Sequence, residues 1–230
     1  VGRLSSSTAS DGEVNEYGYD PAGNRTRVTT SGTPAGESEV VAQFNAAGQL
    51  TGTTTTGAGA GSASYAFDGA GNRSSQTVNG QSTSFAHDPA GRLLGTQADG
   101  RSTSYAYDGL DRRTQVTDVT EYGTNTTGTV WDGFDPAATS SDLHGATDLF
   151  RDPYGAVAFQ DGPYGNEWVL GDQRNATATT GAGGAITDLV DYADYGGAGY
   201  ESTGWSSLVG NDQQPGDPTL GLDNYYARDY

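Results

Sequence analysis

The stretch at residues 65–73 reads YAFDGAGNR, and it recurs as FAHDPAGRL at residues 85–93 and as YAYDGLDRR at residues 105–113. The three copies begin 20 residues apart. A fixed period of this kind indicates that one structural unit is used several times, so the unit has to be identified before any other feature of the chain is interpreted.

The first two copies contain the turn signature Asp-x-x-Gly, of which Asp88-Pro89-Ala90-Gly91 is the clearest example. Asp at the first position and Pro at the second are typical of a type I turn, and the following Gly can take the left-handed conformation that closes a three-residue hairpin loop. Asn79-Gly80 and Asp99-Gly100 follow half a period later and are strong two-residue hairpin signals. The sequence therefore predicts an all-β fold, an antiparallel meander of β-hairpins.

The same turn signature occurs outside the strict repeat. It starts at Asp20 and, with asparagine in place of aspartate, at Asn45, whereas Asp111 stands at the glycine position of the last copy. Since aspartate tolerates the left-handed conformation better than most residues, we expect a hairpin there as well. We assign structural turn roles to Asp20, Gly23, Asn45, Gly48, Asp68, Gly71, Asp88, Gly91, Asp108 and Asp111.

Aromatic residues precede most of these turns, usually in pairs separated by one residue. Side chains alternate along a strand, so both members of a pair lie on one face of the sheet. We favour cross-strand stabilisation as their role. The alternative is a stripe of flat rings on which a saccharide stacks, and its candidate residues are Tyr17, Tyr19, Tyr65, Phe67, Phe85, Tyr105 and Tyr107.

The composition is poor in apolar residues. Only 33% of the chain is hydrophobic, against about 45–50% in ordinary globular domains, a class that also counts glycine. Disorder and a thin, single-layer sheet are the two interpretations. The 14 Tyr, 6 Phe and 3 Trp residues favour the sheet, because aromatic side chains argue for packing.

The formal charge is −18, from 29 acidic and 11 basic residues, and all of the basic residues are arginine. Such a chain repels phosphate backbones, so we expect no nucleic-acid partner. It contains no cysteine, which excludes disulfides and thiol chemistry. No apolar run approaches 18 residues, so we expect no membrane span. Because the first residue is Val1, we expect the sequence to be a fragment or a processed product.

Candidate reactive residues do not form a convincing constellation. The turn aspartates are expected to bond to their own loops and not to pair as an acid and a base. His87 and His144 have no neighbouring zinc ligand or nucleophile motif. Asp188, Asp191 and Asp194 cluster, yet they lack the spacing of a calcium loop. We therefore expect no catalysis, no metal and no cofactor.

The Tyr-Asp-x-x-Gly repeat resembles the YD repeat of Rhs proteins, whose relatives include the C subunits of Tc toxins, the wall-associated polymorphic toxins and the teneurins. Segments 168–180, 192–196 and 221–230 are similar to the part of the Rhs core that follows the repeats. The family's autocleavage signature, two Asp-Pro-x-Gly elements placed after that core, is absent. No protease residues are therefore carried over, although self-cleavage stays a third hypothesis.

The resemblance implies a β-strip that curves or spirals into the wall of a shell enclosing a C-terminal toxin domain, in a secreted or surface protein of bacteria. We expect a YD-repeat strip at residues 1–124 and a core-associated β segment at residues 125–230, continuous with the same sheet. The implied partner is the enclosed toxin domain or the rest of the shell. The alternative function is an adhesive or carbohydrate-binding module that recognises glycans.

Overall fold

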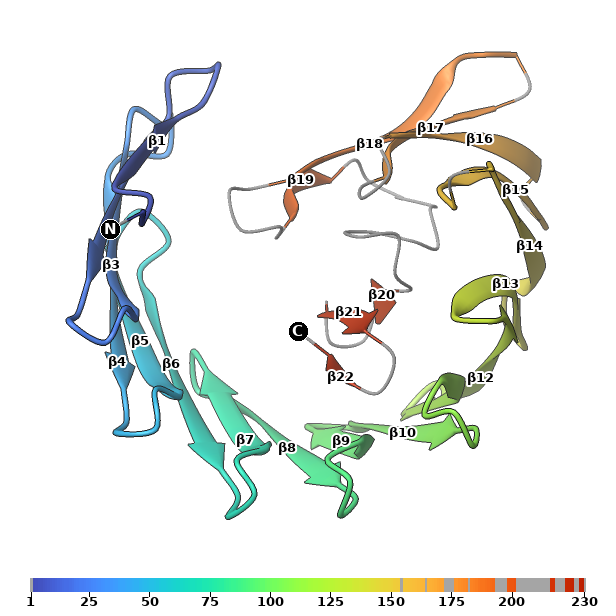
Figure 1. The fold of residues 1–230 in the computed structure, drawn as a ribbon, viewed down its shortest axis with the longest axis horizontal. Coiled ribbons are helices and arrows are strands. Elements are labelled where there is room, and N and C mark those ends of the chain that lie inside the picture. Colours follow the sequence, from blue (N-terminus) through green and yellow to red (C-terminus); the bar gives the residue numbers. More distant parts are fainter. Residues whose placement is uncertain are drawn as a thin grey trace. The chain divides into compact units, whose positions relative to one another are not determined.

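The computed structural model describes residues 2–153, 155–163, 165–171, 176–181 and 183–192, together with four short backbone segments further on. These segments are β19 (Ala198–Glu201), β20 (Gly216–Asp217), β21 (Leu222–Tyr225) and β22 (Arg228–Asp229). The chain forms two compact units, Val1–Phe85 with Gln97–Asp99, and Ala86–Thr96 with Gly100–Tyr230. Figure 1 shows the strands in chain order.

The first unit is a meander in which each strand pairs antiparallel with the next. Its strands are short and similar in length, and the last two residues of the final one cluster with the second unit. They are β1 (Ser6–Thr8), β2 (Val14–Tyr19), β3 (Arg25–Ser31), β4 (Ser38–Phe44), β5 (Leu50–Gly57), β6 (Gly61–Phe67), β7 (Arg73–Val78) and β8 (Gln81–His87).

The second unit continues in the same manner, again with antiparallel pairing of consecutive strands from β10 onwards. Its strands are β9 (Leu93–Ala98), β10 (Arg101–Tyr107), β11 (Arg113–Thr120), β12 (Gly123–Asp132), β13 (Asp135–Ser141), β14 (Gly145–Arg151), β15 (Val157–Gly162), β16 (Gly165–Gly171), β17 (Ala176–Gly181) and β18 (Ile186–Tyr192). The last two residues of β9 cluster with the first unit. No helix occurs among the described residues, so the predicted all-β hairpin meander is confirmed. The division predicted at residue 124 stays a prediction.

The two predicted kinds of hairpin turn alternate along the repeat. Val78 pairs with Gln81, which leaves Asn79-Gly80 as a two-residue loop. Both loop residues have positive φ, 51° and 86°, as a type I′ turn requires. At the other kind of turn, the amide of Asp68 donates to the carbonyl of Asn72 over 2.8 Å, and the register slips between Ala66 and Phe67. That slip is the bulge that accompanies a three-residue loop.

The cross-strand register separates the side chains of the first unit into two faces. Tyr17 lies opposite Val28, and Tyr65 lies opposite Gln76, so we call this the tyrosine face. The other, the hydroxyl face, carries directly opposed pairs such as Thr54 with Ser62 and Thr77 with Ser82. Most residues of this face are polar, including the Arg27–Glu39 ion pair, and no second layer is present among the described residues to bury it.

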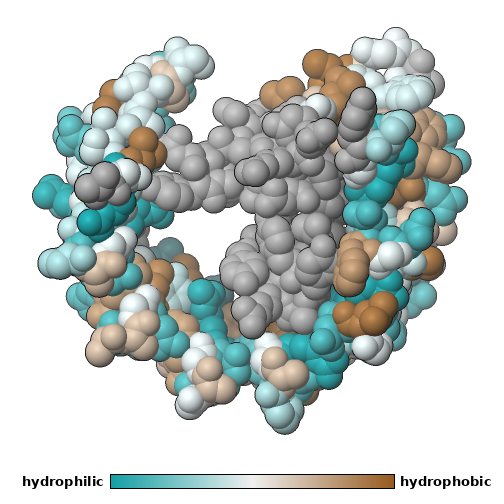
Figure 2. Space-filling view, viewed as in Figure 1, coloured by the Kyte–Doolittle hydropathy of each residue, from teal (hydrophilic) through white to brown (hydrophobic). Residues whose placement is uncertain are grey.

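Burial is correspondingly sparse. The buried apolar side chains among the described residues are all in the second unit: Leu93, Tyr105, Leu149, Val157, Val169 and Ala178. Polar and apolar residues are interleaved over the strands and do not gather into one large patch in the view of Figure 2. The low apolar content of the sequence therefore reflects a single-layer sheet.

A pair of glycines in one turn tests the assignment of the repeat loop. Gly71 has a φ of +91°, whereas Gly69 does not lie in the left-handed region and has nothing within 4 Å of an added Cβ. We expect Gly71→Ala to lower the free energy of unfolding by about 1–2 kcal/mol, because an L-residue is strained at this φ. Gly69→Ala should change it by less than about 0.5 kcal/mol. Urea denaturation followed by circular dichroism measures both, and equal effects would contradict the turn assignment.

Candidate functional site

The turn aspartates bond to their own loops. The Asp68 Oδ1 atom accepts hydrogen bonds from the amides of Ala70 and Asn72, at 2.9 and 2.8 Å, and Oδ2 accepts one from Asn72 Nδ2 at 3.0 Å. Asp20, Asp88 and Asp108 accept the equivalent set of bonds from backbone amides and from the side chain four residues on. Each carboxylate is thus committed to closing its own hairpin, not to a reaction.

These bonds lower the pKa of the four carboxyl groups. A side-chain donor, Asn24, Asn72 or Arg112, is the main cause of the lowered pKa at Asp20, Asp68 and Asp108. At Asp88 the main cause of the lowered pKa is the backbone amide of Arg92. Hydrogen bonds donated to a carboxylate favour its charged form, so these groups are ionised at neutral pH.

Asn45 shows why asparagine can replace the turn aspartate. Its Oδ1 accepts hydrogen bonds from the amides of Ala47 and Gln49, both at 3.0 Å. Its Nδ2 donates to Gln49 Oε1 at 2.7 Å, so the side chain four residues on acts here as the acceptor. The turn therefore needs an oxygen at this position and no charge.

Asp111 adopts the left-handed conformation that glycine has in the other copies. Its φ is 63°, and its amide donates to the carbonyl of Asp108 over 3.2 Å. Its carboxylate accepts a hydrogen bond from Arg92 Nη1 at 2.7 Å. The aspartate thus keeps the turn and adds an ion pair with the preceding repeat.

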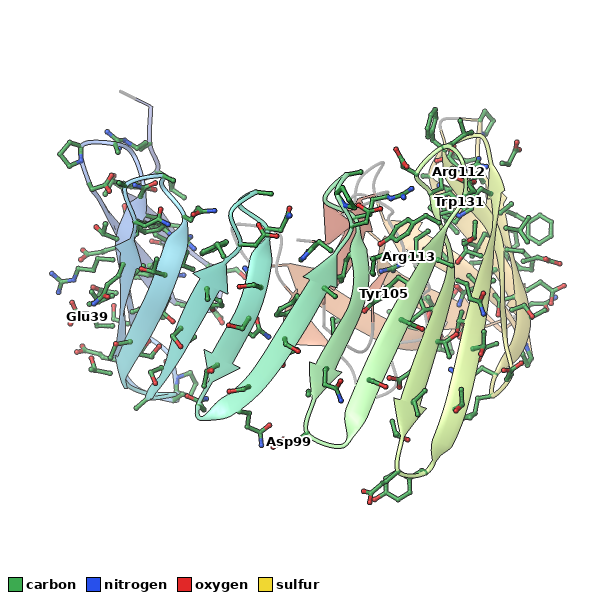
Figure 3. The ribbon with its side chains drawn as sticks, turned by 90° about the horizontal axis from the view of Figure 1, so that it is seen from below. Glu39, Asp99, Tyr105, Arg112, Arg113 and Trp131 are labelled. Carbon is green, nitrogen blue, oxygen red and sulfur yellow. The ribbon has the colours of Figure 1, made fainter. Side chains whose placement is uncertain are left out.

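Several turns contact the next turn through the residue that follows the left-handed turn residue, which is glycine or, before Arg112, Asp111. These contacts were not predicted from the sequence. Where this residue is long it reaches the following turn, and in the first unit Arg3 Nη1 donates to the Asp20 carbonyl at 3.2 Å and Gln49 Nε2 to the Gly71 carbonyl at 3.1 Å. In the second unit, Arg92 reaches Asp111, and Arg112, labelled in Figure 3, donates to the Gly133 carbonyl. We call this set of contacts the turn ladder.

A second series of contacts occurs in both units, in which a guanidinium lies over each of five tyrosine rings. The distances from Cζ to the ring centroid are 4.8–5.7 Å, for Arg3 over Tyr19, Arg25 over Tyr17, Arg73 over Tyr65, Arg92 over Tyr107 and Arg113 over Tyr105. Cations placed within about 6 Å of a ring centroid are attracted to the face of the ring. One face of each of these rings is therefore occupied.

Tyr105 and Arg113 are the most deeply placed of these pairs, with 6% and 5% of their surfaces exposed. Figure 3 shows them side by side on β10 and β11, near Trp131, whose Nε1 donates to the Arg113 carbonyl at 3.0 Å. Phe67 and Phe85, the phenylalanines of the predicted stripe, are half-buried. The geometry favours the stabilising role of the stripe, and saccharide stacking on it stays a prediction.

An ion-pair cluster joins β10 and β11 on the same face as Tyr105. Arg101 donates from Nε and Nη2 to the two oxygens of Asp118, each over 2.7 Å, and the Thr103 hydroxyl donates to Asp118 at 3.0 Å. The arginine is the main cause of the lowered pKa of Asp118. This cluster was not predicted from the sequence. Its signal is an Arg and an Asp at diagonal positions of one hairpin, since Asp118 lies opposite Thr103, two residues from Arg101.

The remaining candidates do not assemble into a reactive site in the described part of the chain. No three His, Asp or Glu side chains gather there as a metal site. His87 is half-buried, and His144 lies exposed in the loop before β14. Asp194 and most of the predicted core motifs at 172–175, 193–196 and 226–227 lie outside the described residues, as do the side chains of Asp188 and Asp191. No helix long and apolar enough to cross a bilayer occurs among the described residues.

Two segments of the chain match a family model. Residues 1–37 and 96–124 match the sequence model of the RHS repeat family. A search of curated proteins found no match.

Solved structures that match the chain include Tc toxin assemblies. A chain in the crystal structure of TcdB2, TccC3 and Cdc42 shares 12% sequence identity with the present chain. The match has a TM-score of 0.48 and covers 95% of the present chain and 15% of the other. TcdB2–TccC3 without its hypervariable C-terminal region is 10% identical, with a TM-score of 0.39 over 98% of this chain and 19% of the other. The Photorhabdus luminescens Tc holotoxin pore is also 10% identical, with a TM-score of 0.37 over 100% of this chain and 19% of the other. The present chain therefore spans less than a fifth of these chains.

The lowered pKa values predict loss of stability in acid. A carboxyl group whose pKa is lower in the folded state stabilises it above the unfolded value, 3.8 for aspartate, and this stabilisation is lost as the pH falls through the folded value. We expect the free energy of unfolding to fall below pH 4. Asp68→Asn should make that fall smaller, since Asn45 shows that the amide fits the turn.

The control for this prediction is Glu121→Gln, because Glu121 is exposed. Urea titrations of both variants between pH 2.5 and pH 7, at low protein concentration to limit association near the isoelectric point of about 4.1, measure the effect. If the free energy of unfolding of both variants depends on pH as in the parent chain, the turn carboxylates do not cause the loss of stability in acid.

The buried stacking pair predicts a large mutational effect. Arg113→Ala should lower the free energy of unfolding by about 2–3 kcal/mol, because it removes a desolvated guanidinium and its packing over Tyr105. Arg27→Ala is the matched control, since the Arg27 side chain is 58% exposed in its ion pair with Glu39. That change should cost less than about 1 kcal/mol. Chemical denaturation of both variants checks the difference, and similar values would contradict the importance of the stack.

Proposed function

We propose that this chain, whose residues 1–37 and 96–124 match the RHS repeat model, is a segment of the β-sheet wall of a shell and that the shell encloses a C-terminal toxin domain. The observation that supports the proposal is the repeated hairpin itself, in which Asp20, Asp68, Asp88 and Asp108 accept the same kind of hydrogen bond. In this proposal, the chain acts by forming a barrier and not by catalysis.

The single-layer construction suits a wall. A wall has two accessible faces and needs no solid core, and the hydroxyl face of the first unit is lined by short polar side chains such as Thr54 and Thr77. Rigidity has to come from within the layer. The turn ladder and the stacked Arg–Tyr pairs supply it, because each joins one hairpin to its neighbour or one strand to the next.

The proposed setting is a secreted or cell-surface protein of a bacterium, and the proposed partners are the enclosed domain and the rest of the shell. These follow from the resemblance of the repeats to the family. The absence of a reactive cluster among the described residues is compatible with a wall but does not carry the proposal.

The carbohydrate-binding alternative has less support. A saccharide stacks on a free ring face, and guanidinium groups lie over five of the seven candidate rings. A glycan array with the quadruple variant Tyr65→Ala, Phe67→Ala, Tyr105→Ala and Tyr107→Ala separates the functions. Glycan binding that is lost in this variant, while the far-ultraviolet circular dichroism is retained, would favour the alternative.

Protease protection in the parent polypeptide tests enclosure. We expect the segment that follows the Rhs core to resist proteinase K at pH 7.5 in the parent protein and to be digested when it is produced alone. Arg113→Ala combined with Gly71→Ala should remove the protection, because both weaken the sheet, whereas Arg27→Ala should retain it.

Two outcomes of that digestion would overturn the proposal. One is digestion of the segment at the same rate in the parent and in isolation. The other is a parent polypeptide with no domain beyond the core.

Incubation of the present chain at pH 5–8 tests the proposal that it has no catalytic activity. Mass spectrometry should find the chain intact, and self-cleavage would contradict a purely structural role.

A further inference from the structure

Three aromatic side chains form a row across the neighbouring strands β14, β15 and β16, with one ring on each strand. Phe150 pairs with Phe159, which pairs with Trp168. The ring centroids are 5.6 and 5.0 Å apart, and neighbouring rings are tilted by 53° and 59°. We call these residues the aromatic row, and the three strands lie side by side in Figure 1.

The aromatic row faces away from the buried side of its strands. Leu149 and Val169, the strand neighbours of Phe150 and Trp168, are each 8% exposed, whereas Phe150 is 50% exposed and Trp168 is 54% exposed. Side chains alternate along a strand, so the row belongs to the face opposite to Leu149. Three neighbouring aromatic residues on an exposed face are more typical of an interaction surface than of internal packing.

Two carboxylates border the row on the same face. Asp148 and Asp161 are directly opposite each other on β14 and β15, two residues from Phe150 and Phe159. Both are exposed, and neither has an ion pair or hydrogen bond among the described residues. Like charges directly opposite on a sheet are destabilising, so this pair costs stability unless a cation joins it.

The chain itself shows which group fits such a set. Arg92 lies over the Tyr107 ring at 5.4 Å and also bonds to the carboxylates of Asp88 and Asp111, at 2.6 and 2.7 Å. One guanidinium therefore satisfies a ring and two acids. The aromatic row has the same two kinds of partner, three rings and the carboxylates of Asp148 and Asp161. No guanidinium of the described residues lies over any of the three rings.

The spacing allows the same arrangement. Residues two apart on one strand are separated by about 7 Å, so the rings and the carboxylates form two parallel lines at that distance. A guanidinium within about 6 Å of a ring centroid can reach a carboxylate of the neighbouring line. The tilt of the rings does not give the flat platform on which a saccharide stacks, which favours a ligand that touches the rings one at a time.

We propose that the aromatic row with Asp148 and Asp161 binds a basic polypeptide segment of a partner protein, in which arginine alternates with apolar residues. The arginines lie over the rings and pair with the carboxylates, and the apolar residues cover the exposed edges of Phe150 and Trp168. The charge of the whole chain, −18, favours the approach of a basic partner. This inference does not depend on the enclosure of a toxin.

The probe for this surface is a synthetic decapeptide of alternating arginine and leucine, titrated into the full chain by isothermal calorimetry at 50 and 300 mM salt. We expect binding that weakens at the higher salt concentration. Trp168→Ala and the double variant Asp148→Asn with Asp161→Asn should each weaken it by about threefold to tenfold, the range for loss of a cation–π or ion-pair contact.

Matched variants and peptides distinguish this site from general attraction to an acidic protein. Tyr122→Ala removes another exposed ring, and Glu121→Gln with Asp142→Asn removes two other exposed acids, and both should bind like the parent chain. An alternating lysine–serine peptide keeps the positive charge without the apolar residues, and a glutamate–leucine peptide keeps the apolar residues without the positive charge. Both should bind at least threefold more weakly.

The proposal is overturned by equal affinity of the Trp168 and aspartate variants and the parent chain, or by equal binding of the lysine–serine or glutamate–leucine peptide. Binding of a neutral oligosaccharide that is lost with Trp168→Ala would assign the row to saccharides instead. The aspartate double variant guards against a folding artefact, since removing two opposed like charges does not destabilise the sheet.

Discussion

The hydrogen bonds that each turn carboxylate or amide accepts from its own loop are the constraint on which the rest of the molecule depends. They fix the hairpin at Asp20, Asn45, Asp68, Asp88 and Asp108, and the bulge that goes with each turn sets which side chains share a face. A thin sheet has little apolar burial to correct an error of register, so local turn chemistry has to supply the specificity that a core supplies elsewhere.

The repeat unit made the strands and turns predictable, because Asp-x-x-Gly and Asn-Gly encode backbone conformation locally. The Asp111 turn was anticipated for the same reason, and its φ of 63° agrees. The turn ladder and the Arg101–Asp118 cluster were not anticipated. They depend on which side chains meet between strands, and this follows only from the register. The aromatic row was missed too, since Phe150, Phe159 and Trp168 belong to no sequence motif and become neighbours only by strand pairing.

Arginine has two distinct uses in this chain. At Arg92 and Arg112 the guanidinium ties successive turns together, and at Arg73 and Arg113 it covers a tyrosine ring. Lysine, a point charge without a planar face, does both less well, which gives a physical reason for the absence of lysine among the 11 basic residues. The five tyrosines of the aromatic stripe predicted from the sequence thus form Arg–Tyr stacks.

The two kinds of turn lie at opposite ends of the hairpins of the first unit, and these two ends differ in how well they tolerate insertions. The loops that begin with Asp20, Asn45 and Asp68 have one length, whereas the loops between β3 and β4 and between β5 and β6 differ in length from Asn79-Gly80. Insertions at residues 32–37 or 58–60 leave the turn ladder and both faces in place. The turns at one end of the hairpins therefore keep a constant length. The loops at the other end can accept additional residues without a change in the sheet.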